Sequence, residues 1–152
     1  MAINPNTDFS AGAVLTAAQQ NRFPRGIMAL SNLTANTSIP NAETTRTSVS
    51  FTAIANRYYR ITWYEGLCTN ANASVNNFYL RLDTTGGTII GTANLYMVAG
   101  DNKPNILSVV TTFSAGTRTI YARATENAAT STTLTASSTQ PAFLLVEDIG
   151  PA

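Results

Sequence analysis

The sequence has 152 residues, carries a formal net charge of +1, and is charged at only 11% of its positions. This weak charge balance excludes the basic footprint of a nucleic-acid-binding protein, and no apolar run approaches the ~20 residues that cross a membrane. Because His is absent and Cys68 is the only cysteine, imidazole-based catalysis and a Cys/His zinc site are excluded as well.

Residues 1–26 differ in pattern from the rest and are predicted to form an N-terminal arm. Thr16 and Gln19 fit a capping box, which predicts a short helix over about residues 16–22. Two interpretations are open: a helical turn packed on the edge of the domain, or an arm that docks on a neighbouring subunit. A helix this short needs packing to be stable. The apolar side chains that we assign to the assembly arm are Phe9, Val14, Leu15 and Phe23.

From residue 27 to residue 152, strand and turn patterns follow one another and predict one β-sandwich domain. Apolar residues recur at every second position in segments such as 49–53, 58–64 and 78–82. Gly86-Gly87 fits a hairpin turn, because glycine accepts the positive φ of primed turns. With about eight to ten short strands and regular turn signals, we expect an all-β fold. The expected form is an antiparallel β-sandwich or jelly roll with a short N-terminal arm and helical turn.

The densest aromatic segment, residues 58–64, is predicted to be a strand with two different faces. Tyr59, Ile61 and Trp63 fit the core, which leaves the alternate residues outside. Tyrosines favour interfaces because one end of the side chain is apolar and the other forms hydrogen bonds. The outward side chains that we assign to a possible partner surface, for protein or glycan, are Tyr58, Arg60 and Tyr64.

The acidic residues form no obvious catalytic pair. Glu147 and Asp148 are adjacent, so on a strand their side chains point to opposite faces. Carboxylates from distant strands could still meet as a glycosidase pair, but only eight acids are present and no aromatic cleft motif accompanies them. We expect no enzyme, no catalytic residue, no cofactor and no metal, with calcium held by loop oxygens as the alternative left open.

Three segments resemble bacteriophage virion structural proteins. Residues 8–21, with Phe9, Gly12 and Val14-Leu15-Thr16-Ala17-Ala18, resemble the F-x-x-G-x-V-L-T-A-A-x-x-N opening of many phage tail-fibre and other virion proteins. Residues 143–151 resemble the L-x-V-E-D-I-G-P ending of a β-sandwich domain of phage minor tail and related virion proteins. Residues 57–62 resemble the R-x-Y-R-I-T-like strand of that same domain. The resemblance implies a virion protein of the minor tail, fibre or capsid decoration type, without catalytic residues.

Two functions follow from this resemblance. The first is an outer capsid decoration, cement or head-fibre protein, whose arm docks on a major capsid or tail protein and whose sandwich forms a homo-oligomer, with a trimer as one form. The lack of a collagen-like or coiled-coil stalk favours it. The second is a tail-associated receptor-binding module, of minor tail or tail fibre type, that contacts host surface glycan or protein. Its surface would be the outward aromatics and the expected loops 69–77, 99–105 and 126–133. Because residues 1–5 begin no signal peptide, we expect synthesis in the host cytoplasm, and the virion as the final location, with neither nucleic acid nor membrane as partner.

Overall fold

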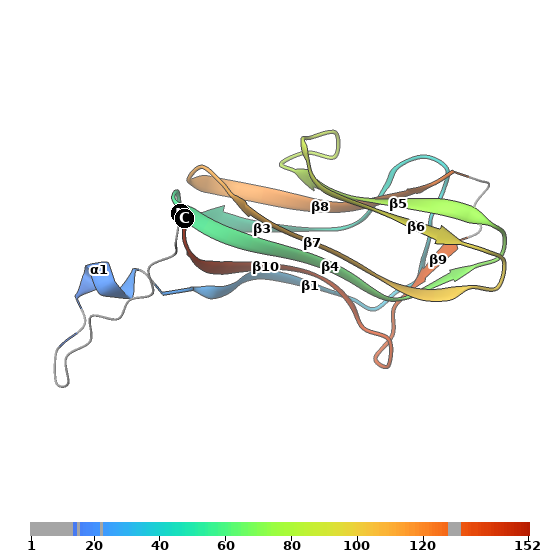
Figure 1. The fold of residues 1–152 in the computed structure, drawn as a ribbon, viewed down its shortest axis with the longest axis horizontal. Coiled ribbons are helices and arrows are strands. Elements are labelled where there is room, and N and C mark those ends of the chain that lie inside the picture. The colour runs from blue at the N-terminus through green and yellow to red at the C-terminus, as the bar shows by residue number, and fades with distance from the viewer. Residues whose placement is uncertain (1–13, 15, 22, 128–131) are drawn as a thin grey trace.

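The computed structural model (Figure 1) describes residues 14, 16–21, 23–127 and 132–152, and two antiparallel β-sheets pack face to face in it. Sheet A contains β1 (Gly26–Leu33), β2 (Thr37–Ser38), β4 (Arg57–Asn70), β7 (Asn102–Thr112), β9 (Thr132–Thr135) and β10 (Ala142–Pro151). Sheet B contains β3 (Thr44–Ala53), β5 (Ser74–Leu82), β6 (Ile89–Met97) and β8 (Gly116–Glu126). The predicted all-β sandwich of jelly-roll type is confirmed.

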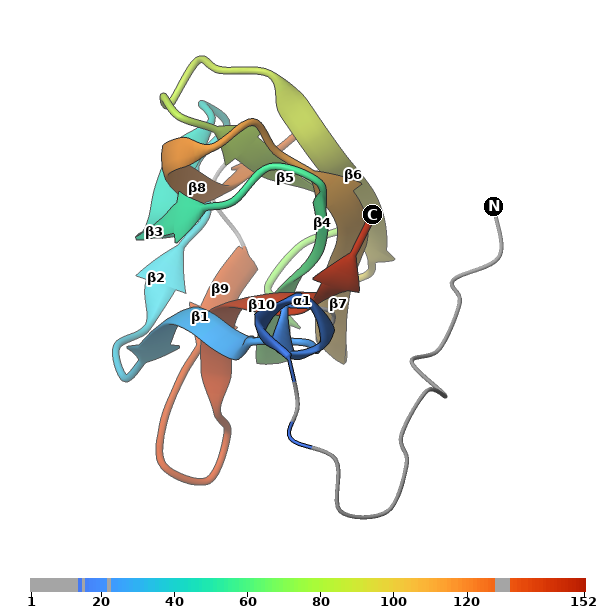
Figure 2. The same ribbon diagram turned by 90° about the vertical axis from the view of Figure 1, so that its left-hand side faces the viewer.

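Strand β4 is the axis of sheet A. One of its edges pairs with β10 along 57–65 and with β9 along 67–70, while β7 runs along its other edge. β1 extends the sheet beyond β10, and β2 extends it beyond β9. Sheet B has the order β3-β8-β5-β6. Because β4, β7 and β10 lie in sheet A and β3, β5 and β8 in sheet B, the chain crosses repeatedly between the sheets, which is jelly-roll connectivity (Figure 2).

The core lies between the two sheets and is aromatic at its centre. Tyr59, Trp63 and Phe78 are fully buried, and the Trp63 and Phe78 ring centroids are 5.2 Å apart at an edge-on angle. A second group joins Tyr59 to Phe51 and Phe113, with centroid distances of 5.3 Å and 5.6 Å. Edge-on and tilted pairs of this kind add stabilisation beyond the area they bury. The period-two pattern therefore identified the inner face of β4 correctly.

A buried ion pair also joins the sheets. Arg46 on β3 donates from Nε to Glu65 Oε1 on β4 at 2.9 Å, and both side chains are almost inaccessible to solvent. Trp63 Nε1 donates to the same carboxylate oxygen at 2.9 Å. Arg46 Nη2 donates to the second oxygen of Glu65 at 3.3 Å, and Nη1 donates to Ala35 O and to Thr37 Oγ1 on β2. A charge this deep is tolerated because its donors and acceptors are matched.

Two local features differ from the sequence-based expectation. The helix α1 spans Ala17–Gln20, a single turn, whereas about 16–22 was expected. The expected loops 69–77 and 99–105 are wrong in part, since β4 continues to Asn70, β5 begins at Ser74, and β7 begins at Asn102. The physical reason is that backbone pairing, of Thr69 with both Asn102 and Thr133 for example, extends through residues whose polar side chains are typical of loops.

Candidate assembly surface

The three residues predicted to form a partner surface lie together on the outer side of β4. Arg60 is exposed, and Tyr58 and Tyr64 are half-buried, while the intervening Tyr59 and Trp63 have no exposed surface. Their outward orientation is therefore confirmed, and it follows from the alternation of side chains along a strand. Their role as a partner surface stays a prediction.

Strand pairing brings apolar side chains from other strands beside these three. Tyr64 lies opposite Phe143 on β10 and Ile106 on β7, and the Tyr64 and Phe143 ring centroids are 5.3 Å apart. Residues directly opposite each other share one face of a sheet. This surface is termed the outer face of sheet A, and its other apolar members are Ile27, Leu30, Tyr58, Val110 and Leu145. Several are widely accessible, with Ile106 62%, Val110 53% and Leu30 46% exposed.

Two pairs of polar side chains near the centre of the outer face of sheet A bond to each other. Arg60 and Glu147 form an ion pair at 2.8 Å, in which the side chains are 49% and 21% exposed. Thr62 and Ser108 share a hydrogen bond between their hydroxyls, at 3.2 Å. The face consequently carries no net charge from this pair, and its polar centre is bordered by aromatic and aliphatic side chains.

The outer face of sheet B has a different chemistry. Glu43 accepts hydrogen bonds from Arg81 at 2.6 Å and 2.7 Å and forms an ion pair with Arg123 at 2.9 Å. The Arg81 guanidinium, hydrogen-bonded to the Glu43 carboxylate, lowers the pKa of that carboxyl. The same guanidinium lies 5.5 Å from the centre of the Tyr79 ring. Most remaining outward positions are hydroxyl or amide residues, including Thr45, Ser48, Ser50, Thr52, Asn77, Asn94, Thr119 and Thr125.

The arm joins the sandwich at a buried ion pair that sequence reasoning did not identify. Arg57, at the start of β4, donates to both carboxylate oxygens of Asp148 on β10, and the two side chains are 5% and 0% exposed. Two of its other N–H groups, one on Nη1 and one on Nη2, donate to the backbone carbonyls of Asn21 and Phe23, each at 2.6 Å. Arg57 and Asp148 are termed the arm clamp. The arm therefore leaves the sandwich beside the C-terminal strand, as Figure 1 shows.

A bulge in β10 prepares Asp148 for this role. The register between β10 and β4 shifts between Asp148 and Gly150, and Gly150 adopts a φ of +124°, which side chains disfavour. The Gly150 N–H donates to Asp148 Oδ1 at 3.0 Å, which adds to the donors from Arg57. Glu147 faces outward to Arg60 and Asp148 faces inward to Arg57. The expectation that this acidic pair divides between two faces is confirmed.

Of the four side chains assigned to the assembly arm, the structure places two. Val14 is 90% exposed and Phe23 is 40% exposed, whereas Phe9 and Leu15 lie outside the described residues. Within α1, the Gln20 and Asn21 N–H groups donate to the Thr16 and Ala17 carbonyls at 3.0 Å. Docking of the arm on a neighbour stays a prediction, because these contacts lie within the chain itself.

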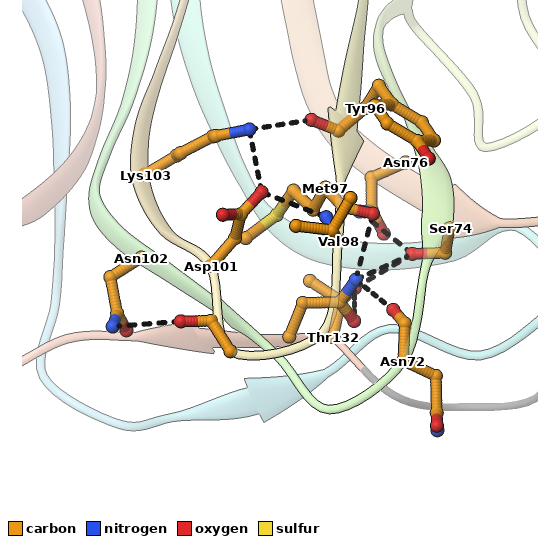
Figure 3. A network of polar contacts seen from close by, with 12 residues as sticks. Asn72, Ser74, Asn76, Tyr96, Met97, Val98, Asp101, Asn102, Lys103 and Thr132 are labelled. Carbon is orange, nitrogen blue, oxygen red and sulfur yellow. Dashed lines mark hydrogen bonds and ion pairs between the residues drawn. The ribbon is translucent and has the colours of Figure 1, made fainter.

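The opposite end of the sandwich contains a polar network that orders its turns (Figure 3). Asn70 Nδ2 donates to Ser74 Oγ at 3.2 Å, and Asn70 Oδ1 accepts from Thr132 Oγ1 at 2.9 Å. Nearer the surface, Asp101 pairs with Lys103 at 2.7 Å and accepts from the Val98 N–H at 2.8 Å. The hydrogen bond from Lys103 lowers the pKa of Asp101 most, and the hydrogen bond from the Val98 N–H lowers it further. Two of the segments suggested as a receptor surface, 69–77 and 99–105, thus form hydrogen bonds of their own, while residues 128–131 of the third, 126–133, lie outside the described residues.

Three observations on the described residues concern metal binding, the reactivity of the thiol and membrane spanning. Among them, no three His, Cys, Asp or Glu side chains lie close enough to hold a metal ion. Cys68 is fully buried, and burial raises the pKa of its thiol to about 12. In the part of the chain that the structure covers, no helix has the length and hydropathy of a membrane span.

Comparison with known proteins shows likeness in fold alone. No protein-family model and no curated protein matches the sequence. Among solved structures, Eiger TNF from S. frugiperda aligns over 84% of this chain and 96% of its own, with 12% identity and a TM-score of 0.46. A chain of infectious bursal disease virus, Gx strain, aligns over 84% of this chain and 32% of its own, with 10% identity and a TM-score of 0.46. The carbohydrate-binding module CBM36, solved with calcium and xylotriose, aligns over 81% and 98%, with 17% identity and a TM-score of 0.40.

Two features of the surface escaped sequence reasoning, and one of them had a usable signal. The segment Phe143-Leu144-Leu145-Val146 is apolar at successive positions, so a strand there must be apolar on both faces. Leu144 and Val146 are fully buried on the inner face, so Phe143 and Leu145 lie on the outer face. The arm clamp had no comparable signal, because Arg57 and Asp148 are distant in sequence.

Proposed function

We propose that this chain is a non-enzymatic structural protein of a bacteriophage virion, an outer capsid decoration, cement or head-fibre protein. In this function the arm docks on another virion protein, and the sandwich forms a homo-oligomer, of which a trimer is one form. One observation carries the proposal. The three segments that resemble phage virion proteins meet at one place, because Arg57 in one of them donates hydrogen bonds to the Asp148 carboxylate in the second and to the Asn21 carbonyl in the third.

The arm clamp suits an attachment device. Ordering a free segment costs roughly 1–2 kcal/mol per residue, and the clamp fixes the last residues of the arm before any partner binds. Each large apolar side chain then buried contributes roughly 1.5–3 kcal/mol, so the four assigned side chains together contribute on the order of 6–12 kcal/mol. After the entropic cost of ordering the rest of the arm is subtracted, the net binding free energy per copy is modest. Attachment through several linked copies gives the tight binding that a particle requires.

The experiment that tests this function locates the protein on its particle. Virions of the phage that encodes the chain are labelled with a gold-conjugated antibody against the purified protein and imaged by electron microscopy. We expect label over the capsid. Label confined to the tail would favour the alternative, a receptor-binding module of the minor tail or tail fibre. Unlabelled intact virions would overturn both.

A truncated chain then tests the division of labour. Removal of residues 1–20 retains Asn21 and Phe23, whose carbonyls bind Arg57, so we expect the sandwich to stay folded. When added to particles that lack the protein, the full chain should bind and the truncated chain should not. Equal occupancy of the two forms would place attachment on the sandwich and contradict the role given to the arm.

A further inference from the structure

We infer that the outer face of sheet A is the contact surface between copies of this chain. The inference rests on the proposed homo-oligomer and names its interface. Antiparallel sheets with one face in water normally alternate apolar and polar side chains. Here β10 is apolar on both faces, and outward Ile106, Val110 and Leu30 are each close to half exposed or more. Something other than water is therefore expected to cover this face.

The size of the face is sufficient for an interface. The strands β1, β10, β4 and β7 lie side by side, and four strands at ~4.8 Å spacing with about seven residues each at ~3.3 Å give a flat footprint of roughly 440 Å². Exposed apolar patches of roughly 300–600 Å² on a monomer are often functional. Two such faces together cover roughly 900 Å², a little below the roughly 1,000 Å² that a stable specific interface exceeds and within the range of weak ones. The area thus fits weak association between two isolated copies. Association becomes tight when many copies are attached to the same particle.

The charges of the face favour a second copy as the occupant. Its charged pair, Arg60 and Glu147, is already neutralised within one chain, so no unmatched charge requires an oppositely charged partner. Thr62 and Ser108 likewise satisfy each other. A flat, apolar, neutral face is complementary to itself, which is the condition for an isologous contact between identical subunits. In Figure 1, α1 lies beyond the end of the strands that form this face, so a contact across the face would leave α1 available for a different virion protein.

The chain contains a matched pair of serines for the test. Ser108 is exposed on the outer face of sheet A and bonds to Thr62 across the strands. Ser50 is exposed on the outer face of sheet B and bonds to Thr119 in the same way, at 2.8 Å. Native Cys68 does not interfere, because it is fully buried and its thiol has a pKa of about 12. S108C and S50C therefore each introduce one reactive thiol, on opposite faces.

Each cysteine variant is kept dilute and labelled with a maleimide while wild-type chain is added in excess. We expect the labelling of S108C to slow at least about threefold as wild-type protein rises through roughly 1–100 µM, the range of a weak interface. The labelling of S50C should not change. Equal rates for S108C at all concentrations would overturn the inference, as would equal slowing of both variants. Protection of S108C by virions but not by excess chain would assign the face to a virion protein instead.

A second measurement uses lysine in place of cysteine. Lysine at position 108 would be buried without a partner in the contact, so S108K should weaken self-association at least about tenfold in sedimentation equilibrium. S50K should associate like the wild type. A wild-type chain that stays monomeric, or association that S108K leaves intact, would contradict the inference. These results concern purified protein, so they are independent of where the gold label places the chain on a particle.

Discussion

The outer faces of the two sheets differ in surface chemistry, although sheet B also exposes Tyr96 and Ile89 on its edge strand β6. On sheet B, Arg81, Arg123 and Glu43 form an ion-paired group among hydroxyl and amide side chains. On sheet A, the equivalent positions carry aromatic and aliphatic side chains around one neutralised pair. Both sheets bury an apolar inner face, so the fold itself does not require this difference. The proposed self-association gives this difference a function, since it would cover the outer face of sheet A and leave the outer face of sheet B in water.

The largest expected effect is a difference in stability between variants on the inner and outer sides of sheet A. Asp148→Asn removes the charge that neutralises buried Arg57, and an uncompensated buried charge costs about 3–5 kcal/mol. Glu147→Gln, one residue earlier and facing outward, should cost about 0–1 kcal/mol, because Arg60 keeps contact with water. Urea unfolding of the two variants measures the difference. Equal losses would mean that the arm clamp is not a stabilising element.

An intermediate effect is expected on the outer face of sheet B. Glu43→Gln removes the acceptor shared by Arg81 and Arg123 and should lower the free energy of unfolding by about 1 kcal/mol. Because Arg81 lowers the pKa of Glu43 in the folded protein, the wild-type contribution is complete above the ordinary value of 4.5. This contribution to stability is lost as the pH falls through the lowered pKa that Glu43 has in the folded protein. Unfolding curves across this acidic range should converge for wild type and variant, and a gap that persists would contradict this account.

The smallest expected effect concerns the ion pair at the centre of the outer face of sheet A. Neutralising the central pair with Arg60→Gln and Glu147→Gln should change monomer stability by less than about 1 kcal/mol. The same double variant should strengthen self-association severalfold, because the contact no longer has to dehydrate an ion pair.

The control for that variant is the Lys103–Asp101 pair at the loop end, whose exposure is similar at 42% and 24%. Lys103→Gln with Asp101→Asn should leave self-association unchanged, since this pair lies off the outer face of sheet A. Sedimentation equilibrium of both double variants against wild type gives the comparison. Strengthening by the control variant as well would show that net surface charge, and not the identity of the face, controls association.

The amino-acid sequence was sufficient to predict the class of fold and the direction in which individual side chains point. Alternation along a strand is a local property, so Tyr59 and Trp63 were assigned inside and Tyr58 and Tyr64 outside without knowledge of their neighbours. The same rule separated Glu147 from Asp148. Polar strand ends were the exception, because Asn70 and Ser74 point inward into a hydrogen-bonded network that residue type alone does not distinguish from a loop.

Which strands lie side by side, and hence which side chains form a surface, became known from the three-dimensional fold. Phe143, Tyr64 and Ile106 come from three separate parts of the chain and become neighbours through the pairing of β10 and β7 with β4. The arm clamp likewise joins Arg57 to a carboxylate 91 residues away. Strand pairing depends on how both sheets close over a common core, which is a non-local property. A one-dimensional pattern therefore shows that a strand has an outer face, and the fold shows what that face is made of.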